Sequence, residues 1–230
     1  MTDTLNNYDT IAGQYDFLSR LVFGKAQVRA QADLLPYVMA GSRVLIVGGG
    51  TGWILEELAA RYPSGLRITY VEISGKMIAL AKKRDAGRNE IVFVHAPVEA
   101  FGTQEGFDRQ AGFVRDERYD AILTGFLFDN FSPVRAAAVF SLLDGLLEKG
   151  GHWLLADFFY QKGRGRLWQG VMLKAMYWFF GWLCRVEGRE LVDTAPLFGA
   201  AGYFQLYTAS HYGGFIQSVV YEKKERGDGM

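Results

Sequence analysis

The sequence is short of cysteine and has no excess of charge of either sign. Cys184 is the one cysteine among 230 residues, which excludes an intramolecular disulfide and a cysteine zinc cluster. The 25 basic and 25 acidic residues balance, and no stripe of lysine and arginine follows the chain, so nucleic acid is not an expected partner. The histidines and carboxylates show no metal-ligand spacing. We therefore expect neither a metal site nor a nucleic-acid interface.

A signal peptide is not apparent at the start of the chain. Residues 1–7 are polar and lack the apolar core of such a segment, which favours a cytoplasmic protein. The length suits a single domain over 1–230, and half of the residues are hydrophobic, enough for a substantial core. Within it we expect four parts: N-terminal helices (8–39), a core of alternating strands and helices (43–157), a helical segment (160–195) and C-terminal strands (203–222).

The most informative segment is 44–52, Val-Leu-Ile-Val-Gly-Gly-Gly-Thr-Gly. Its apolar residues predict a short buried strand, followed by a glycine turn and an amphipathic run from Trp53. This arrangement brings backbone N–H groups against a ligand at the end of a parallel sheet. Glu72 ends a second apolar strand 20 residues after Gly52, where a carboxylate can accept both hydroxyl hydrogens of a ribose. We expect a nucleoside-containing cofactor, although an ordinary strand–helix connection would also explain the turn by itself.

Position 53 helps to decide which nucleoside is expected. The dinucleotide pattern G-x-G-x-x-G needs a third glycine there, and Trp53 argues against a nicotinamide oxidoreductase. A phosphate-binding loop would need Gly-Lys-Ser/Thr, which the chain lacks. What remains is G-x-G-x-G, formed by Gly48, Gly50 and Gly52. This pattern resembles motif I of the class I methyltransferases that use S-adenosylmethionine.

Four more segments resemble that family in the expected order. They are 72–77, 91–99, 119–126 and 146–155. The resemblance implies an α/β fold with a Rossmann-like, doubly wound and mostly parallel sheet, and a helical lid inserted after the fifth strand. It also implies S-adenosyl-L-methionine as cofactor, with no metal. The cofactor-binding residues that we expect are Gly48, Gly50, Gly52, Glu72, Ile73, Met77, Val98, Glu99 and Thr124.

A closer resemblance concerns the ubiquinone/menaquinone biosynthesis C-methyltransferases. It rests on Tyr8–Asp16, Phe126–Phe131 and His211–Ile216. Those enzymes methylate a ring carbon of a prenylated aromatic, which implies a lipophilic or aromatic small-molecule acceptor here. Methylation requires that the acceptor lose a proton, and the candidate bases at the cleft are Asp129, His211, Tyr15 and Asp157. For Asp129 a capping role before the helix at Pro133 is the alternative, and for His211 a structural role.

Two acidic residues of the family pattern are absent. Ile46 stands where the family has an Asp that fixes the glycine turn, and Pro97 stands where a carboxylate accepts from adenine. We therefore expect adenine between Ile73 and Val98, with its edge near the N–H of Val98 or the carboxylate of Glu99. A degenerate, non-catalytic binding protein of the same fold is the alternative function.

Residues 167–183 form a second unusual segment, apolar on nearly every side of a predicted helix. It is short for a membrane span and contains Lys174. Three interpretations stay open: a packed core or homodimer helix, a lid that lines an apolar substrate pocket, and a peripheral contact with a membrane surface. For the third, Lys162, Arg164 and Arg166 just upstream would suit anionic headgroups.

Overall fold

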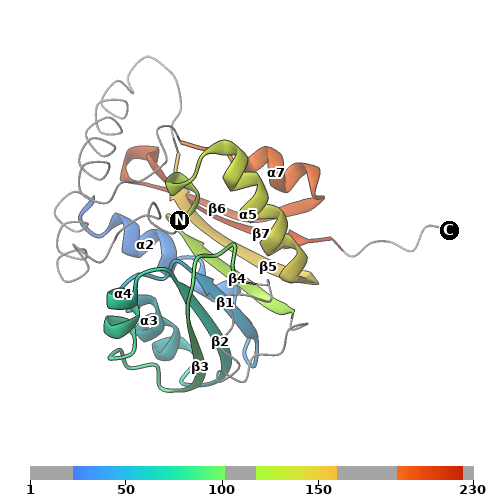
Figure 1. Ribbon diagram of the computed structural model, residues 1–230. Coiled ribbons are helices and arrows are strands. Elements are labelled where there is room, and N and C mark those ends of the chain that lie inside the picture. Colours follow the sequence, from blue (N-terminus) through green and yellow to red (C-terminus); the bar gives the residue numbers. More distant parts are fainter. Residues whose placement is uncertain (1–22, 102–117, 160–190, 225–230) are drawn as a thin grey trace, which may run out of the picture.

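The computed structural model describes residues 23–101, 118–159 and 191–224. A seven-stranded sheet runs through them in the order β3-β2-β1-β4-β5-β7-β6 (Figure 1). The strands are β1 (Arg43–Val47), β2 (Ser64–Glu72), β3 (Arg88–His95), β4 (Tyr119–Gly125), β5 (Leu147–Phe158), β6 (Tyr203–His211) and β7 (Ile216–Lys223). The first five strands in this order pair in parallel, and the pairs of β7 are antiparallel. The expected doubly wound, mostly parallel fold is confirmed.

The central strands are apolar on both faces, as parallel strands covered by helices must be. In β1, Val44 and Ile46 contribute to one apolar cluster, while Leu45 and Val47 contribute to the other. This alternation follows from the two-residue repeat of a strand. All four side chains are buried, so the sheet is the wall between two cores.

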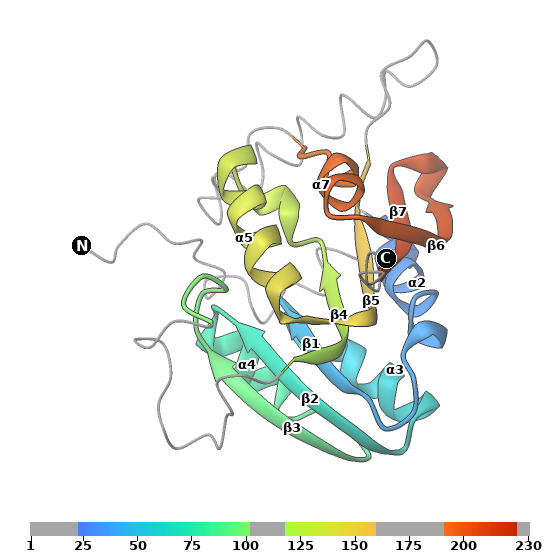
Figure 2. The same ribbon diagram turned by 90° about the vertical axis from the view of Figure 1, so that its right-hand side faces the viewer.

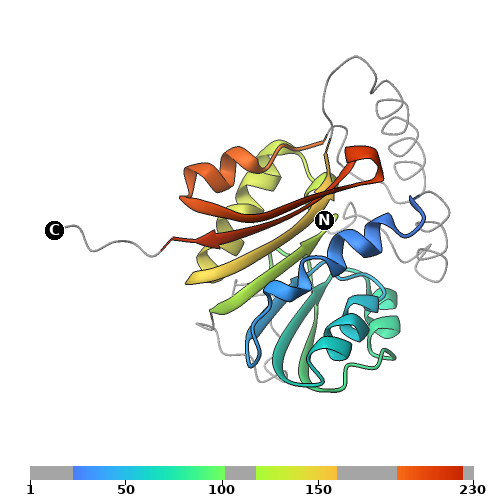
Figure 3. The same ribbon diagram turned by 180° about the vertical axis from the view of Figure 1, so that it is seen from behind.

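Helices cover both faces of the sheet (Figure 2). One face is covered by α2 (Ala26–Ala32) and α3 (Trp53–Arg61), and the other by α5 (Pro133–Leu146) and α7 (Ala195–Ala200). A further helix, α4 (Gly75–Ala81), lies beside β2 and β3. Seen from behind, α2 lies alongside the C-terminal strands β6 and β7 (Figure 3). Short 3₁₀ turns complete the described elements: η2 (Leu35–Tyr37), η4 (Phe128–Asn130) and η5 (Tyr212–Gly214).

Two local features differ from the sequence-based expectation. The segment 146–155 contains Gly150 and Gly151, which resemble a family turn that precedes the fifth strand. Here both lie inside β5, where Gly150 has a φ of +74° and the register to β4 shifts. Helix α5 is capped by Ser132, whose hydroxyl accepts from the N–H of Arg135, with Pro133 at its first position. Asp129 therefore does not cap this helix.

Several expected elements fall outside the described residues. One is the helix expected in 8–22, which includes Tyr15. Another is most of the helical segment expected in 160–195, with the apolar run 167–183, Cys184 and the basic residues Lys162, Arg164 and Arg166. Within the described ranges, no helix has both the length and the apolar composition needed to cross a bilayer.

Candidate nucleoside-binding site

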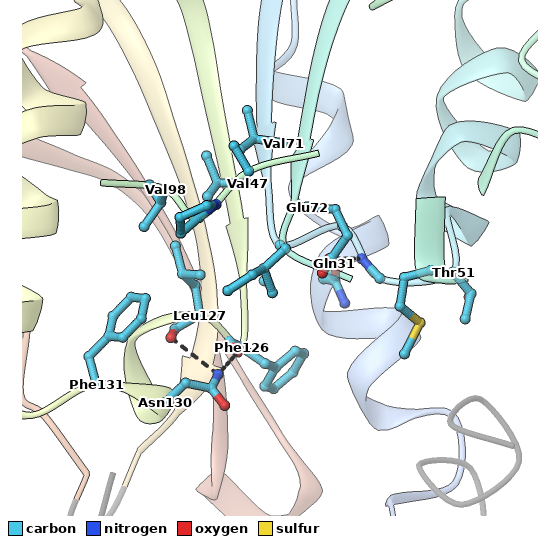
Figure 4. Close-up of a pocket in the computed structure, with 18 of the residues that line it drawn as sticks. Gln31, Val47, Thr51, Val71, Glu72, Val98, Phe126, Leu127, Asn130 and Phe131 are labelled. Atoms are coloured by element: carbon cyan, nitrogen blue, oxygen red, sulfur yellow. Dashed lines mark hydrogen bonds between the residues drawn. The ribbon is translucent and has the colours of Figure 1, made fainter. Parts of the chain in front are cut away.

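A pocket opens at the carboxyl ends of the parallel strands, where open α/β sheets bind ligands (Figure 4). Its walls come mainly from α2, the turn after β1, the end of β2, the turn after β3 and the segment after β4, and single residues of α3, α4 and α5 complete them. The strand ends converge there because all of these strands run the same way. Of the nine expected cofactor-binding residues, seven line it: Gly48, Gly50, Glu72, Ile73, Met77, Val98 and Glu99.

The glycine turn is fixed from several sides. The N–H of Gly48 donates to the carbonyl of Val71 at 2.9 Å, and Arg84 Nε donates to the carbonyl of Thr51 at 3.0 Å. Gly48, Gly50 and Gly52 all have φ between +62° and +78°, a backbone conformation that side chains with a Cβ disfavour. The turn therefore needs glycine for its path as well as for its close approach to a ligand.

Glu72 provides the main buried charge of the pocket. Its carboxylate accepts the N–H of Gly50 at 3.0 Å and the N–H of Ser74 at 2.9 Å, one on each oxygen. The residue is only 6% exposed. Burial raises the pKa of Glu72, and the two amide hydrogen bonds partly offset that rise. Each carboxylate oxygen has a second acceptor site, so Glu72 can still accept two hydroxyl hydrogens.

A second carboxylate lies at the turn after β3. Arg135 of α5 donates through Nε to Glu99 Oε1, and its guanidinium lies over the ring of Phe131, 4.6 Å from the centroid. The other oxygen, Glu99 Oε2, is buried and has no hydrogen-bond partner among the described residues. Glu99, Phe131 and Arg135 all line the pocket. An unpaired buried acceptor here calls for a donor on a ligand.

The wall after β4 is apolar and its backbone is strained. Phe126 has a φ of +54°, which is unusual for a residue with a bulky side chain. Its N–H donates to the carbonyl of Ala156 at 2.7 Å, and its own carbonyl accepts from Asn130 Nδ2 at 2.8 Å. These bonds hold Phe126 and Leu127 at the pocket (Figure 4). Strain maintained in this way is typical of functional sites.

Two carboxylates lie just behind this wall. Burial raises the pKa of Asp157 to about 7. Burial first, and then the charge of Asp157, raise the pKa of Asp129 well above its usual range. Asp157 accepts from the N–H groups of Phe128 and Phe158, and Asp129 Oδ1 accepts from Asn130 Nδ2 at 2.9 Å. Within the described part of the chain, no three His, Cys, Asp or Glu side chains are grouped to hold a metal ion.

Comparison with known proteins agrees with this geometry. A family model described as a methyltransferase domain matches residues 44–151. A ubiquinone/menaquinone biosynthesis C-methyltransferase of Geotalea daltonii is 42% identical over 82 residues, which are 34% of this chain and 34% of that protein. The region that holds the glycine turn and Glu72 thus matches a methyltransferase domain, and the fold is that of the class I methyltransferases.

Solved methyltransferases share the fold. An O-methyltransferase family 2 protein of Planctomyces limnophilus, in complex with apigenin, superposes with a TM-score of 0.66 at 16% identity, over 92% of this chain and 61% of that one. The N-methyltransferase NodS of Bradyrhizobium japonicum, in complex with S-adenosyl-L-homocysteine, superposes with a TM-score of 0.58 at 13% identity, over 86% and 84%. The matched segment spans about a third of the length of the Geotalea relative.

The structure places other expected residues away from the pocket lining. Thr124 is fully buried, and its hydroxyl accepts from Trp153 Nε1 at 3.0 Å. Gly52 packs against α4, because an added Cβ would lie 2.6 Å from Ala81. His211 Nε2 lies 2.9 Å from Ser218 Oγ and 3.5 Å from Asp33, and so links β6 to β7 and to the end of α2. Thr124 and His211 thus do not line the pocket, and the contacts of His211 favour its structural alternative.

Sequence reasoning missed some residues of the pocket. Gln27 and Gln31 of α2 line it, one helical turn apart. Gln31 also packs against the backbone of Gly125, where an added Cβ would lie 2.5 Å from its Oε1. Their spacing of four residues was the available signal. Asp129 does not line the pocket, although its neighbour Asn130 does.

Proposed function

We propose that this methyltransferase binds S-adenosylmethionine in the pocket described above and transfers its methyl group to a lipophilic or aromatic small molecule. The single observation that supports this most is Glu72. Its buried carboxylate is held by two amides beside the glycine turn and keeps two acceptor sites for a ribose.

The remaining polar groups of the pocket fit the rest of the cofactor. The unpaired Glu99 Oε2 suits the amino group of adenine, in the place where Pro97 offers neither a carboxylate nor an N–H. Ile73 and Val98 supply apolar surface for the adenine faces. At the other end, Gln27 and Gln31 suit the charged amino-acid part of the cofactor, because amides both donate and accept.

The wall of Phe126, Leu127 and Phe131 is the proposed acceptor side. When bound, S-adenosylmethionine would supply a methyl group on a sulfonium: a nucleophilic atom of an acceptor aligned with the carbon–sulfur bond would take the methyl group, and S-adenosylhomocysteine would leave. The side chains of this wall exclude water and orient an apolar acceptor. The name of the Geotalea relative supports a quinone-type ring as the acceptor. The segment 167–183 and Tyr15, which lie outside the described residues, remain the proposed lid over this side.

Asp129 is the proposed proton acceptor for the reaction. It lies behind the apolar wall, and its raised pKa comes from burial beside Asp157. A raised pKa makes the ionised carboxylate a stronger proton acceptor than a solvated one. If Asp129 has this role, Asp129→Asn should reduce turnover at saturating cofactor, with little effect on cofactor affinity.

Calorimetry with S-adenosylhomocysteine and NADH, together with a transfer assay, tests this proposal. We expect S-adenosylhomocysteine to bind and NADH not to bind. We also expect label to pass from methyl-labelled S-adenosylmethionine to members of a panel of prenylated hydroquinones. Cofactor binding without transfer to any aromatic acceptor would instead support a non-catalytic binding protein. NADH binding without S-adenosylhomocysteine binding would contradict the cofactor assignment.

A further inference from the structure

Tyr70 occupies a position from which it can control the glycine turn. It lies in β2, fully buried, and pairs in register with Ile46 of β1. Paired residues of neighbouring parallel strands face the same side of the sheet, so the two side chains lie next to each other beneath the turn. Ile46 is apolar and offers the turn no hydrogen bond. Tyr70 provides a hydroxyl on that side.

The Tyr70 hydroxyl holds the carbonyl group of Gly50. It donates to the carbonyl oxygen of Gly50 at 2.9 Å, while the N–H of the same residue donates to Glu72 at 3.0 Å. Both polar groups of this one glycine are therefore bonded to β2, from residues two positions apart. The orientation of Gly50 fixes where its N–H meets the Glu72 carboxylate. It therefore also fixes the direction in which the other acceptor sites of that carboxylate face.

The ring of Tyr70 also sets how closely the turn can approach. An added Cβ on Gly49 would lie 2.4 Å from the ring atoms Cε2 and Cζ and from the hydroxyl oxygen. The ring is supported from behind by Phe93 of β3, with 5.3 Å between the centroids. Because the ring is buried and supported, Gly49 lies directly on it, and the turn and the ring form one packed unit.

We propose that Tyr70 is a positioning residue for cofactor binding. It holds Gly50 from below, so that the turn and the Glu72 carboxylate keep the geometry that receives a ribose. This inference rests on the proposed function for its ligand, but its structural part concerns the free protein. Without the hydroxyl, the carbonyl of Gly50 loses this hydrogen bond, and we expect the amides of the turn to open more often.

Tyr70→Phe tests this in the full chain, with Tyr62→Phe as the matched control. Tyr62 likewise donates from its hydroxyl to backbone carbonyls, those of Leu35 and Val38, away from the pocket. We expect Tyr70→Phe to raise the Kd for S-adenosylhomocysteine by about 3- to 10-fold, the loss typical of one hydrogen bond. Tyr62→Phe should leave that Kd unchanged, even where it lowers the melting temperature.

Hydrogen exchange of the ligand-free proteins provides a second readout. We expect faster exchange at the amides of 48–52 in Tyr70→Phe than in the parent and in Tyr62→Phe. Parental exchange there, or an equal loss of S-adenosylhomocysteine affinity in both variants, would overturn the role of Tyr70. If the parent itself fails to bind S-adenosylhomocysteine, the proposed function fails, and exchange at the turn still decides whether Tyr70 holds it.

Discussion

The two sides of the pocket are built on different principles. On the side of β1 and β2, the glycine turn and Glu72 are tied into hydrogen bonds, and Tyr70 fills the space beneath. On the other side, formed by the turn after β3 and the segment after β4, the wall is mostly apolar. There the buried Glu99 Oε2 has no partner among the described residues. The first side is organised before any ligand arrives, and the second has polar groups that a ligand can satisfy.

The difference indicates which part of the ligands each side binds. A pre-organised side binds a constant part of the ligand at low entropic cost. An apolar side with few polar groups recognises shape, which suits an acceptor that varies among relatives. We therefore expect substitutions on the first side to remove cofactor binding. Substitutions on the second side should mainly change acceptor binding, or change the affinity for the cofactor by a small factor.

Gly49→Ala should have the largest effect, because it places a methyl group against the buried Tyr70 ring at 2.4 Å. The turn must then move. We expect the free energy of unfolding to fall by about 1–3 kcal/mol and the affinity for S-adenosylhomocysteine to fall by about 10- to 100-fold. Denaturant unfolding and calorimetry measure the two effects.

The control for this substitution is Gly145→Ala in α5. An added Cβ at Gly145 meets nothing within 4 Å, and alanine favours a helix. This variant should bind S-adenosylhomocysteine as the parent does and be slightly more stable. Parental binding by Gly49→Ala would show that the turn is less rigid than its contacts indicate.

Glu72→Gln should come next in size. The glutamine keeps the shape, but its NH₂ group must face one of the two backbone N–H groups that the carboxylate now accepts. We expect about a 10- to 100-fold loss of affinity for S-adenosylhomocysteine, since hydrogen bonds to a charged group are lost. Glu57→Gln, on the exposed face of α3, is the control. A Kd within twofold of the parent would place the ribose elsewhere.

The acidic pair behind the β4 wall predicts a pH dependence of stability. The folded pKa of Asp157 is raised to about 7, so the folded state holds a proton that the unfolded state loses near pH 4. Stability is thus fully present below about pH 4 and is lost as the pH rises towards 7. We expect the free energy of unfolding to fall by about 1–2 kcal/mol over this window, after allowance for partial exposure of the side chain.

Asp157→Asn should flatten that decline, because the amide does not titrate. Unfolding by denaturant at several pH values measures the slope, and Asp85→Asn, at an exposed loop position, is the control. Equal slopes in the parent and in Asp157→Asn would show that this carboxyl is better solvated than its burial indicates.

Glu99→Gln should have the smallest effect. It keeps an acceptor or a donor at the adenine edge but weakens the pairing with Arg135. We expect S-adenosylhomocysteine to bind about 2- to 5-fold more weakly, as for one modest hydrogen bond. Glu90→Gln, an exposed position on β3, should change nothing. A loss as large as that of Glu72→Gln would contradict the division between the two sides.

The features that could be predicted are those set by local sequence. The strand–turn–helix at 44–61 and the acidic end of β2 follow from apolar runs and glycine spacing, and the structure shows both. Glu72 could be placed because parallel strands end at the same edge of a sheet. The segment Phe126–Phe131 carried part of the closer family resemblance, and Phe126 and Phe131 line the pocket.

The features that could not be predicted depend on contacts between distant segments. Whether Tyr70 meets Gly49 depends on the register of β1 and β2. The ion pair of Arg135 with Glu99 joins segments 36 residues apart. The family resemblance implied Thr124 as a cofactor-binding residue, but its hydroxyl accepts from Trp153 in the core. In each case one residue type fits several environments, and packing selects among them.

A crystal structure of this chain with S-adenosylhomocysteine tests the central claim most directly. We predict the adenosyl ribose above Gly48–Gly50, with both hydroxyls donating to the Glu72 carboxylate, and adenine between Ile73 and Val98. A ligand bound outside this pocket, or a ribose that makes no contact with Glu72, would contradict the proposed site.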